Sequence, residues 1–113
     1  MLRNNRFLIA GIAAIVISPS HAACNYPEEV KIPDGATATT EDMVNAQTLV
    51  KQFMADMEAY LDCLDQEETT IPEKQTPEAK ALHLQSHNAA VDEMEAVAAQ
   101  FNEQIRAYKK ANE

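Results

Sequence analysis

The sequence is poor in glycine, serine and tryptophan, and these shortages exclude several kinds of protein. Its 113 residues include two glycines and no tryptophan. Phosphate-cradling loops and dinucleotide-binding fingerprints need several glycines close together. Beyond residue 22 the chain has one glycine, Gly35, and one serine, Ser86, which lies in no nucleophile-elbow sequence. We therefore predict no catalytic residues and a protein that is not an enzyme.

Basic residues are also scarce. Nine Lys and Arg stand against 18 Asp and Glu, so the formal net charge is −9. Such a chain is repelled by nucleic acid and by anionic lipid surfaces. We expect neither as a partner.

Residues 1–22 have the layout of a secretory signal peptide. Two arginines precede the apolar run 7–17, and the small residues Ser20 and Ala22 lie where signal peptidase needs them. The apolar run is too short to span a bilayer. We therefore predict a periplasmic or secreted protein with no membrane segment after cleavage. The mature chain would keep seven basic and 18 acidic residues, a net charge of −11.

Cys24 and Cys63 are the only cysteines, and both remain after cleavage. In a small exported chain the expected state is one disulfide. In the chain-entropy model, closing a loop of about 40 residues stabilises the fold by roughly 4 kcal/mol. Lipidation of Cys24 is an alternative, but His21 stands where a lipobox has an aliphatic residue, and Cys63 would be left unpaired. A pair of metal thiolates would need further ligands and a reducing environment.

Residues 23–40 are predicted to form an extended strap. Val30 and Ile32 alternate with Lys31, as in a segment lying along an apolar groove. The sequence Pro33-Asp34-Gly35 predicts a turn, in which proline presets φ and glycine allows a positive φ.

Residues 41–66 and 77–110 are predicted to be amphipathic helices. Thr39 or Thr40 can cap the first helix, and Thr76 with Pro77 begins the second. Residues 67–76 contain Pro72 and form the expected connection. The fold class is therefore all-α: an antiparallel two-helix hairpin over 41–113, with the strap tied to it by one disulfide.

The predicted pairing of the helices brings Tyr60 opposite His83. The second predicted helix is longer than the first by on the order of ten residues. Ile105 and Tyr108 are therefore expected to overhang the end of the first helix and to form a partner surface. Two helices and a strap leave apolar residues exposed, which favours a homodimer of four helices or a groove that holds another protein.

His83 and His87 are four residues apart on one helix face, as in metal-binding histidine pairs. Asp56, Met57 and Tyr60 are expected nearby, and two imidazoles with one carboxylate suit zinc, nickel or copper. The alternative is that both rings are half-buried or solvated. Four methionines offer a thioether set for Cu(I), but their spacing is that of core residues: Met43, Met54, Met57 and Met94. The acidic faces are interpreted as solvated surface, since no calcium-binding loop is present.

Three short motifs carry a family resemblance: Cys24-Asn-Tyr-Pro27, Ile32-Pro-Asp-Gly35 and Tyr60-Leu-Asp-Cys-Leu64. With them the chain resembles a group of small, uncharacterised exported helical-hairpin proteins of Gram-negative bacteria. The resemblance implies that the two cysteines and the turn belong to one structural device, and it implies no activity or ligand. Periplasmic hairpin proteins that sense metals or misfolded envelope proteins share the layout, but their repeated Leu-Thr-x-x-Gln signature is absent here.

The sequence thus predicts an exported binding or structural protein that acts through self-association or a protein partner. The alternative function is a periplasmic transition-metal binder that uses His83 and His87.

Overall fold

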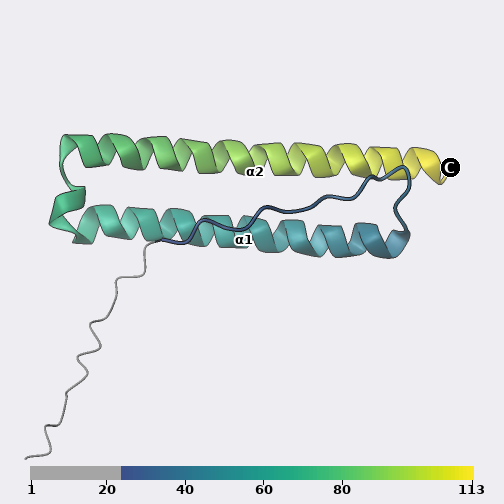
Figure 1. The fold of residues 1–113 in the computed structure, drawn as a ribbon, viewed down its shortest axis with the longest axis horizontal. Helices are drawn as coiled ribbons and strands as arrows, with labels where there is room; N and C mark the ends of the chain where they lie inside the picture. The colour runs from purple at the N-terminus through teal and green to yellow at the C-terminus, as the bar shows by residue number, and fades with distance from the viewer. Residues whose placement is uncertain (1–23) are drawn as a thin grey trace, which may run out of the picture.

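The structure, a computed structural model, describes residues 24–113. The predicted signal peptide therefore lies outside the described residues. The described part contains two long α-helices, α1 (Thr40–Thr70) and α2 (Pro77–Ala111), joined through a short 3-10 helix, η1 (Pro72–Lys74). The two long helices pack side by side as an antiparallel hairpin (Figure 1), which confirms the predicted fold class. None of the described helices is long and apolar enough to span a membrane.

Helix α1 begins with a capping box. The Thr39 hydroxyl accepts a hydrogen bond from the Asp42 amide at 3.1 Å, and the Asp42 carboxylate accepts one from the Thr39 amide at 2.9 Å. These two bonds satisfy amide groups that have no partner within the helix. Thr39 is thus the cap, of the two candidates in the sequence.

The predicted end of the first helix at residue 66 is wrong by one turn. Helix α1 continues to Thr70, and Ile71 leaves the helical conformation with φ −104° and ψ 112°. The steric demand of Pro72 on the preceding residue explains this end point. The polar residues after position 66 do not break the helix. The side-chain hydroxyls of Thr69 and Thr70 both donate hydrogen bonds to the backbone carbonyl oxygen of Gln66.

Helix α2 begins as predicted. Thr76 is the N-cap, its hydroxyl accepts a hydrogen bond from the Ala79 amide at 3.2 Å, and Pro77 occupies the first turn. The last turn contains Lys109 and Lys110, whose charges suit the negative end of the helix dipole.

The core lies along the seam between α1 and α2. Its buried side chains are all hydrophobic: Met43, Ala46, Val50, Phe53, Met57, Ala90, Val97 and Phe101. Met57 is completely buried. Leu84 of α2 is also apolar, yet it is 60% exposed. The apolar surface of α2 is therefore wider than the part that α1 and the strap cover.

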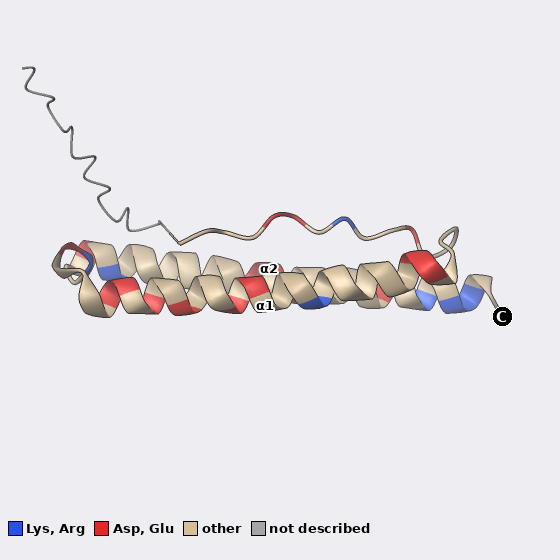
Figure 2. Cartoon of the chain, turned by 90° about the horizontal axis from the view of Figure 1, so that it is seen from below, with Lys and Arg blue, Asp and Glu red and all other residues tan. Residues whose placement is uncertain are grey.

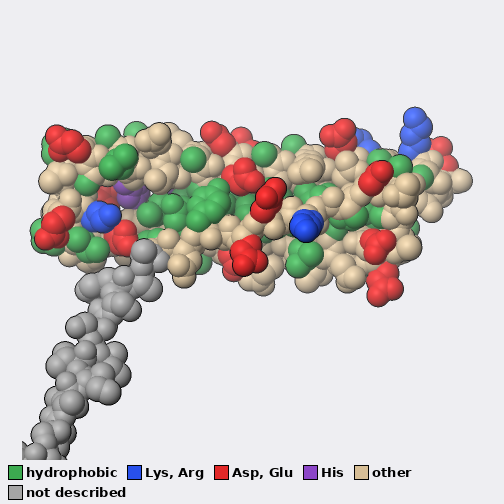
Figure 3. Space-filling view, in the orientation of Figure 1, with side chains coloured by type: hydrophobic (Ala, Val, Ile, Leu, Met, Phe, Trp, Pro, Cys, Tyr) green, Lys and Arg blue, Asp and Glu red, His purple; other side chains and the backbone are tan. Residues whose placement is uncertain are grey.

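Residues 24–39 form the predicted strap along one side of the helix pair (Figure 2). The strap starts at Cys24, which is bonded to Cys63, and runs toward the end of the hairpin where α1 begins (Figure 1). Val30 and Ile32 pack against the core, as expected from their alternation. Figure 3 shows hydrophobic side chains gathered between the helices on this face.

The strap ends in a turn built on Asp34. The Asp34 side chain accepts a hydrogen bond from the Ala36 amide, and its carbonyl oxygen accepts one from Ala38. Gly35 has no positive φ, so the expected role of this glycine is wrong. It is required instead because the strap touches α2 here: a Cβ on Gly35 would lie 2.9 Å from the Tyr108 backbone nitrogen.

The predicted overhang of α2 is also wrong. The helices contain 31 and 35 residues, and the hydroxyls of Thr40 and Tyr108 are hydrogen-bonded across their ends. Ile105 and Tyr108 are half-buried and pack against the core. The longer α1 accounts for the difference, because its extra turn moves the pairing of the two helices along α1 by a few residues. Whether Ile105 and Tyr108 contact a partner stays a prediction.

Candidate functional site

His83 lies between two carboxylates of α1 near the connected end of the hairpin. Its Nε2 atom is 3.0 Å from Asp65 Oδ1, and its Nδ1 atom is 3.0 Å from Glu68 Oε2. The His83 side chain is 16% exposed, whereas that of Asp65 is 62% exposed. The imidazole, which belongs to α2, therefore faces a carboxylate of α1 at each of its two nitrogens.

His87 follows one helical turn after His83. The two rings are nearly parallel, at an angle of 12° with centroids 6.5 Å apart. One ligand atom each from Asp65, His83 and His87 lies within 4.8 Å of the others. The structure thus brings the predicted histidine pair together with one carboxylate, that of Asp65. The Glu68 carboxylate lies next to Nδ1 of His83, the nitrogen that does not face Asp65.

The acidic neighbours of the histidines differ from those expected. The sequence pairing placed Tyr60 opposite His83 and Asp56 nearby, but the structure places Asp65 and Glu68 there. Asp56 instead lies more than two turns before Asp65 on α1, where it accepts a hydrogen bond from the Gln52 side chain. The unpredicted last turn of α1 accounts for the difference. Pro72 was the available signal, because a proline disfavours helical backbone in the residue before it and so allows the helix to continue to Thr70.

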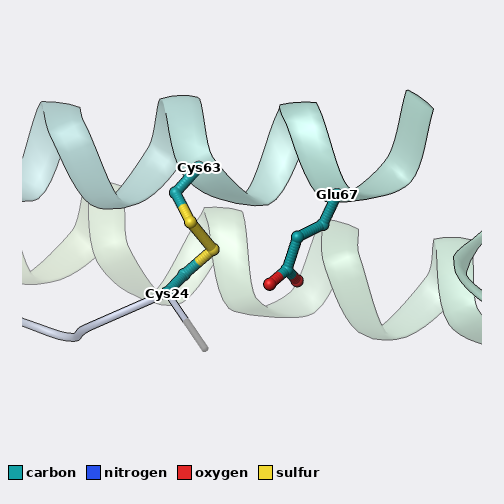
Figure 4. Close-up of side chains that lie close together, drawn as sticks. All are labelled: Cys24, Cys63 and Glu67. Atoms are coloured by element: carbon teal, nitrogen blue, oxygen red, sulfur yellow. A yellow bond between two sulfur atoms is a disulfide. The ribbon is translucent and has the colours of Figure 1, made fainter. Parts of the chain in front are cut away.

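A second group of potential ligands includes the two cysteines of the disulfide. Cys24, Cys63 and Glu67 lie close together, with Glu67 one helical turn after Cys63 (Figure 4). The bond between Cys24 and Cys63 confirms the predicted disulfide. Because a metal-binding cysteine is a thiolate, the bonded sulfurs serve as a structural link here. Cys63 thus anchors the start of the strap to α1.

Tyr26 strengthens this anchor. Its ring meets that of Tyr60 edge to face, at a centroid distance of 5.2 Å and an interplanar angle of 76°. Burial raises the pKa of the Tyr26 hydroxyl, with smaller contributions from Glu93 and Tyr60. Tyr26 nevertheless remains 51% exposed, so it covers the seam only in part.

The four methionines are core residues. Met43 and Met57 are buried, and Met54 and Met94 pack against the buried cluster. Their placement agrees with the packing interpretation rather than with a thioether metal site.

No family model, curated protein or solved structure matches this chain.

Proposed function

We propose that this chain is an exported, non-enzymatic protein that acts by self-association. The observation that supports this function is a second apolar seam on α2, on the side of the hairpin away from the strap. The disulfide supports export to the periplasm or beyond, because such bonds persist in oxidising compartments.

We call the side opposite the strap the far face. Figure 2 shows the strap on one side of the helix pair and no other described segment on the opposite side. On α2, Gln104 marks the strap side, because its side chain accepts a hydrogen bond from the Gly35 amide. The next residue, Ile105, is about 100° further around the helix and so points to the far face.

Ile105 is one of four apolar residues spaced seven apart, which we call the far-face seam: Leu84, Val91, Ala98 and Ile105. They lie roughly 100 to 160° around the helix from Gln104 and border the core on its far side. Ile105 also packs against the core, Val91 and Ala98 are half-buried, and Leu84 is exposed. A seven-residue apolar repeat is the spacing with which helices pack against each other in coiled coils. Met54 and Leu61 of α1, also seven apart, lie on the far side of that helix and are half-buried.

The charges of the hairpin favour a second copy in reversed orientation. Acidic residues of α1 cluster near the connected end, whereas the last turns of α2 contain Arg106, Lys109 and Lys110 (Figure 2). Two copies in the same orientation would bring their acidic ends together. Reversed copies instead place the basic turns of one near the acidic residues of the other, which is the complementary arrangement. A two-fold dimer of this kind uses the same patch on both copies and forms a four-helix assembly.

Two neighbouring alanines provide a matched test. Ala98→Glu would place a charge in the far-face seam, whereas Ala99→Glu would place the same charge on an exposed position one residue further. We expect sedimentation velocity to show a dimer for the unmodified chain and for Ala99→Glu, and a monomer for Ala98→Glu. Helix content measured by circular dichroism should be equal in all three, so that loss of the dimer is not confused with unfolding.

Two results would reject this function. One is an unmodified chain that stays monomeric at every concentration measured, which would leave the far face to a different protein. The other is a dimer that Ala98→Glu does not weaken, which would place the contact elsewhere.

A further inference from the structure

We infer that Asp65, His83 and His87 form a binding site for a divalent transition-metal ion, with Glu68 orienting His83. The ligand class is an ion that accepts imidazole nitrogen and carboxylate oxygen together, of which Zn²⁺ is the probe. This site goes beyond self-association and does not depend on it.

The spacing of the three ligand atoms suits a small ion. They lie within 4.8 Å of one another. Ligand atoms around tetrahedral zinc lie about 2.0–2.2 Å from the metal, which places them roughly 3.3 Å apart. Asp65 Oδ1 and His83 Nε2 are already 3.0 Å apart, so small rotations of the side chains would complete the set.

The hydrogen-bonding capacity of His83 gives a second, independent argument. A neutral imidazole has one donor and one acceptor, and a carboxylate has acceptors only. Both nitrogens of His83 nevertheless lie 3.0 Å from a carboxylate oxygen. One carboxylate oxygen therefore faces the lone pair of the unprotonated ring nitrogen, unless the ring is an imidazolium or a cation lies between the ring and that carboxylate.

The two carboxylates then have different roles. The set whose ligand atoms all lie within 4.8 Å of one another contains Asp65, His83 and His87 but not Glu68. With an ion on Nε2, the Nδ1–H group donates to Glu68. A carboxylate that accepts from the second nitrogen of a ligating histidine fixes the orientation of the ring and raises its basicity. Glu68 is therefore a positioning residue, and Asp65 is a ligand.

The placement of the ligands predicts a consequence for the fold. His83 and His87 come from α2 and Asp65 from α1, so a bound ion would cross-link the two helices near their connection. Three protein ligands leave one tetrahedral position open. Because the Asp65 side chain is 62% exposed, water can occupy that position.

The competing interpretation is an ion pair without a metal, in which a protonated His83 donates to both carboxylates. The two interpretations differ in how they treat His87, which takes no part in the ion pair. They also differ in whether Zn²⁺ adds stability.

The test is calorimetric titration of the oxidised, untagged chain with Zn²⁺, together with thermal unfolding with and without the ion. We expect one ion per chain and a higher unfolding temperature in its presence. Asp65→Asn and His87→Gln should each weaken binding at least tenfold. Asp62→Asn removes an exposed carboxylate one turn earlier on the same helix and should leave binding unchanged.

Glu68→Gln tests the positioning role. Loss of an orienting carboxylate typically weakens metal affinity by about 10 to 100-fold, so this variant should still bind one Co²⁺ with the same ligand-field spectrum but lower affinity. The proposal is overturned if the unmodified chain shows no saturable Zn²⁺ binding. It is also overturned if His87→Gln binds as tightly as the unmodified chain, which would show that His87 is not a ligand.

Discussion

The backbone amide of Gly35 donates a hydrogen bond to the side-chain oxygen of Gln104, at 2.8 Å and across 69 residues of sequence. Gly35 is the only buried residue of the strap. The strap is therefore fixed at two points: Cys24 holds it to α1 near the connected end of the hairpin, and Gly35 holds it to α2 near the opposite end.

The first prediction concerns this close approach. In Gly35→Ala, the new methyl group would overlap the backbone carbonyl of Gln104 and lie 2.9 Å from the Tyr108 backbone nitrogen. Neither backbone atom can move without distorting α2, so the strap must shift and the Gln104 bond is lost. Overpacking of this kind costs about 1–3 kcal/mol. Urea unfolding should show that loss, whereas Ala36→Ser at the exposed next position should leave the free energy of unfolding unchanged.

The fold was predictable because it depends on strong local signals. The apolar repeat, Thr39 and Thr76 as caps, and Pro77 at a first helical turn all agree with the structure. The disulfide was predicted from the number of cysteines and from the oxidising compartment expected for an exported chain. These features need no knowledge of how the helices pair.

Two of the errors, the residues opposite His83 and the overhang of α2, arise because a helix end misplaced by one turn shifts the pairing of the two helices. One extra turn at the end of α1 changed the residues opposite His83 from Tyr60 to Asp65 and Glu68. The same turn removed the overhang of α2. Gly35 was recognised as a turn residue, but its contact with a helix 69 residues away has no local signature.

The second prediction contrasts two apolar side chains by burial. Met57 is completely buried, whereas Leu82 is 64% exposed. Met57→Ala should therefore lower the free energy of unfolding by about 2–5 kcal/mol, the usual cost of such a cavity. Leu82→Ala should change it by less than about 0.5 kcal/mol. Equal losses in urea unfolding would contradict this structure of the core.

The third prediction concerns pH. The hydrogen bond from the Thr39 backbone amide, followed by that of the Thr39 side chain, holds the pKa of the Asp42 carboxyl below its ordinary value. A lowered pKa in the folded state means that the unfolded chain binds the proton more readily. The contribution of Asp42 is therefore fully present above the ordinary pKa of about 3.9 and is lost as the pH falls below it.

Asp42→Asn should reduce the unfolding temperature at neutral pH, and the difference from the unmodified chain should shrink on acidification. Thermal unfolding followed by circular dichroism over this pH range measures that difference. Glu41→Gln serves as the control, because it removes a neighbouring charge of the first turn without removing a bond of the capping box. A difference that stays constant down to low pH would show that the carboxylate charge is not what stabilises the cap.

The last prediction separates the two attachments of the strap. In the double variant Cys24→Ser, Cys63→Ser, the crosslink across 39 residues is absent. The chain-entropy model then predicts a loss of roughly 4 kcal/mol in the free energy of unfolding. Reducing agent should lower the free energy of unfolding of the unmodified chain by a similar amount and leave that of the double variant unchanged.

Hydrogen exchange shows where the strap has come loose. The amides of Gly35 and Ala38 keep their partners, Gln104 and Asp34, without the disulfide, so they should exchange more slowly than those near Tyr26. Adding Gly35→Ala to the double variant should then abolish protection along the whole strap. If protection were lost throughout once the disulfide alone is removed, the contact between Gly35 and α2 would not be an independent attachment.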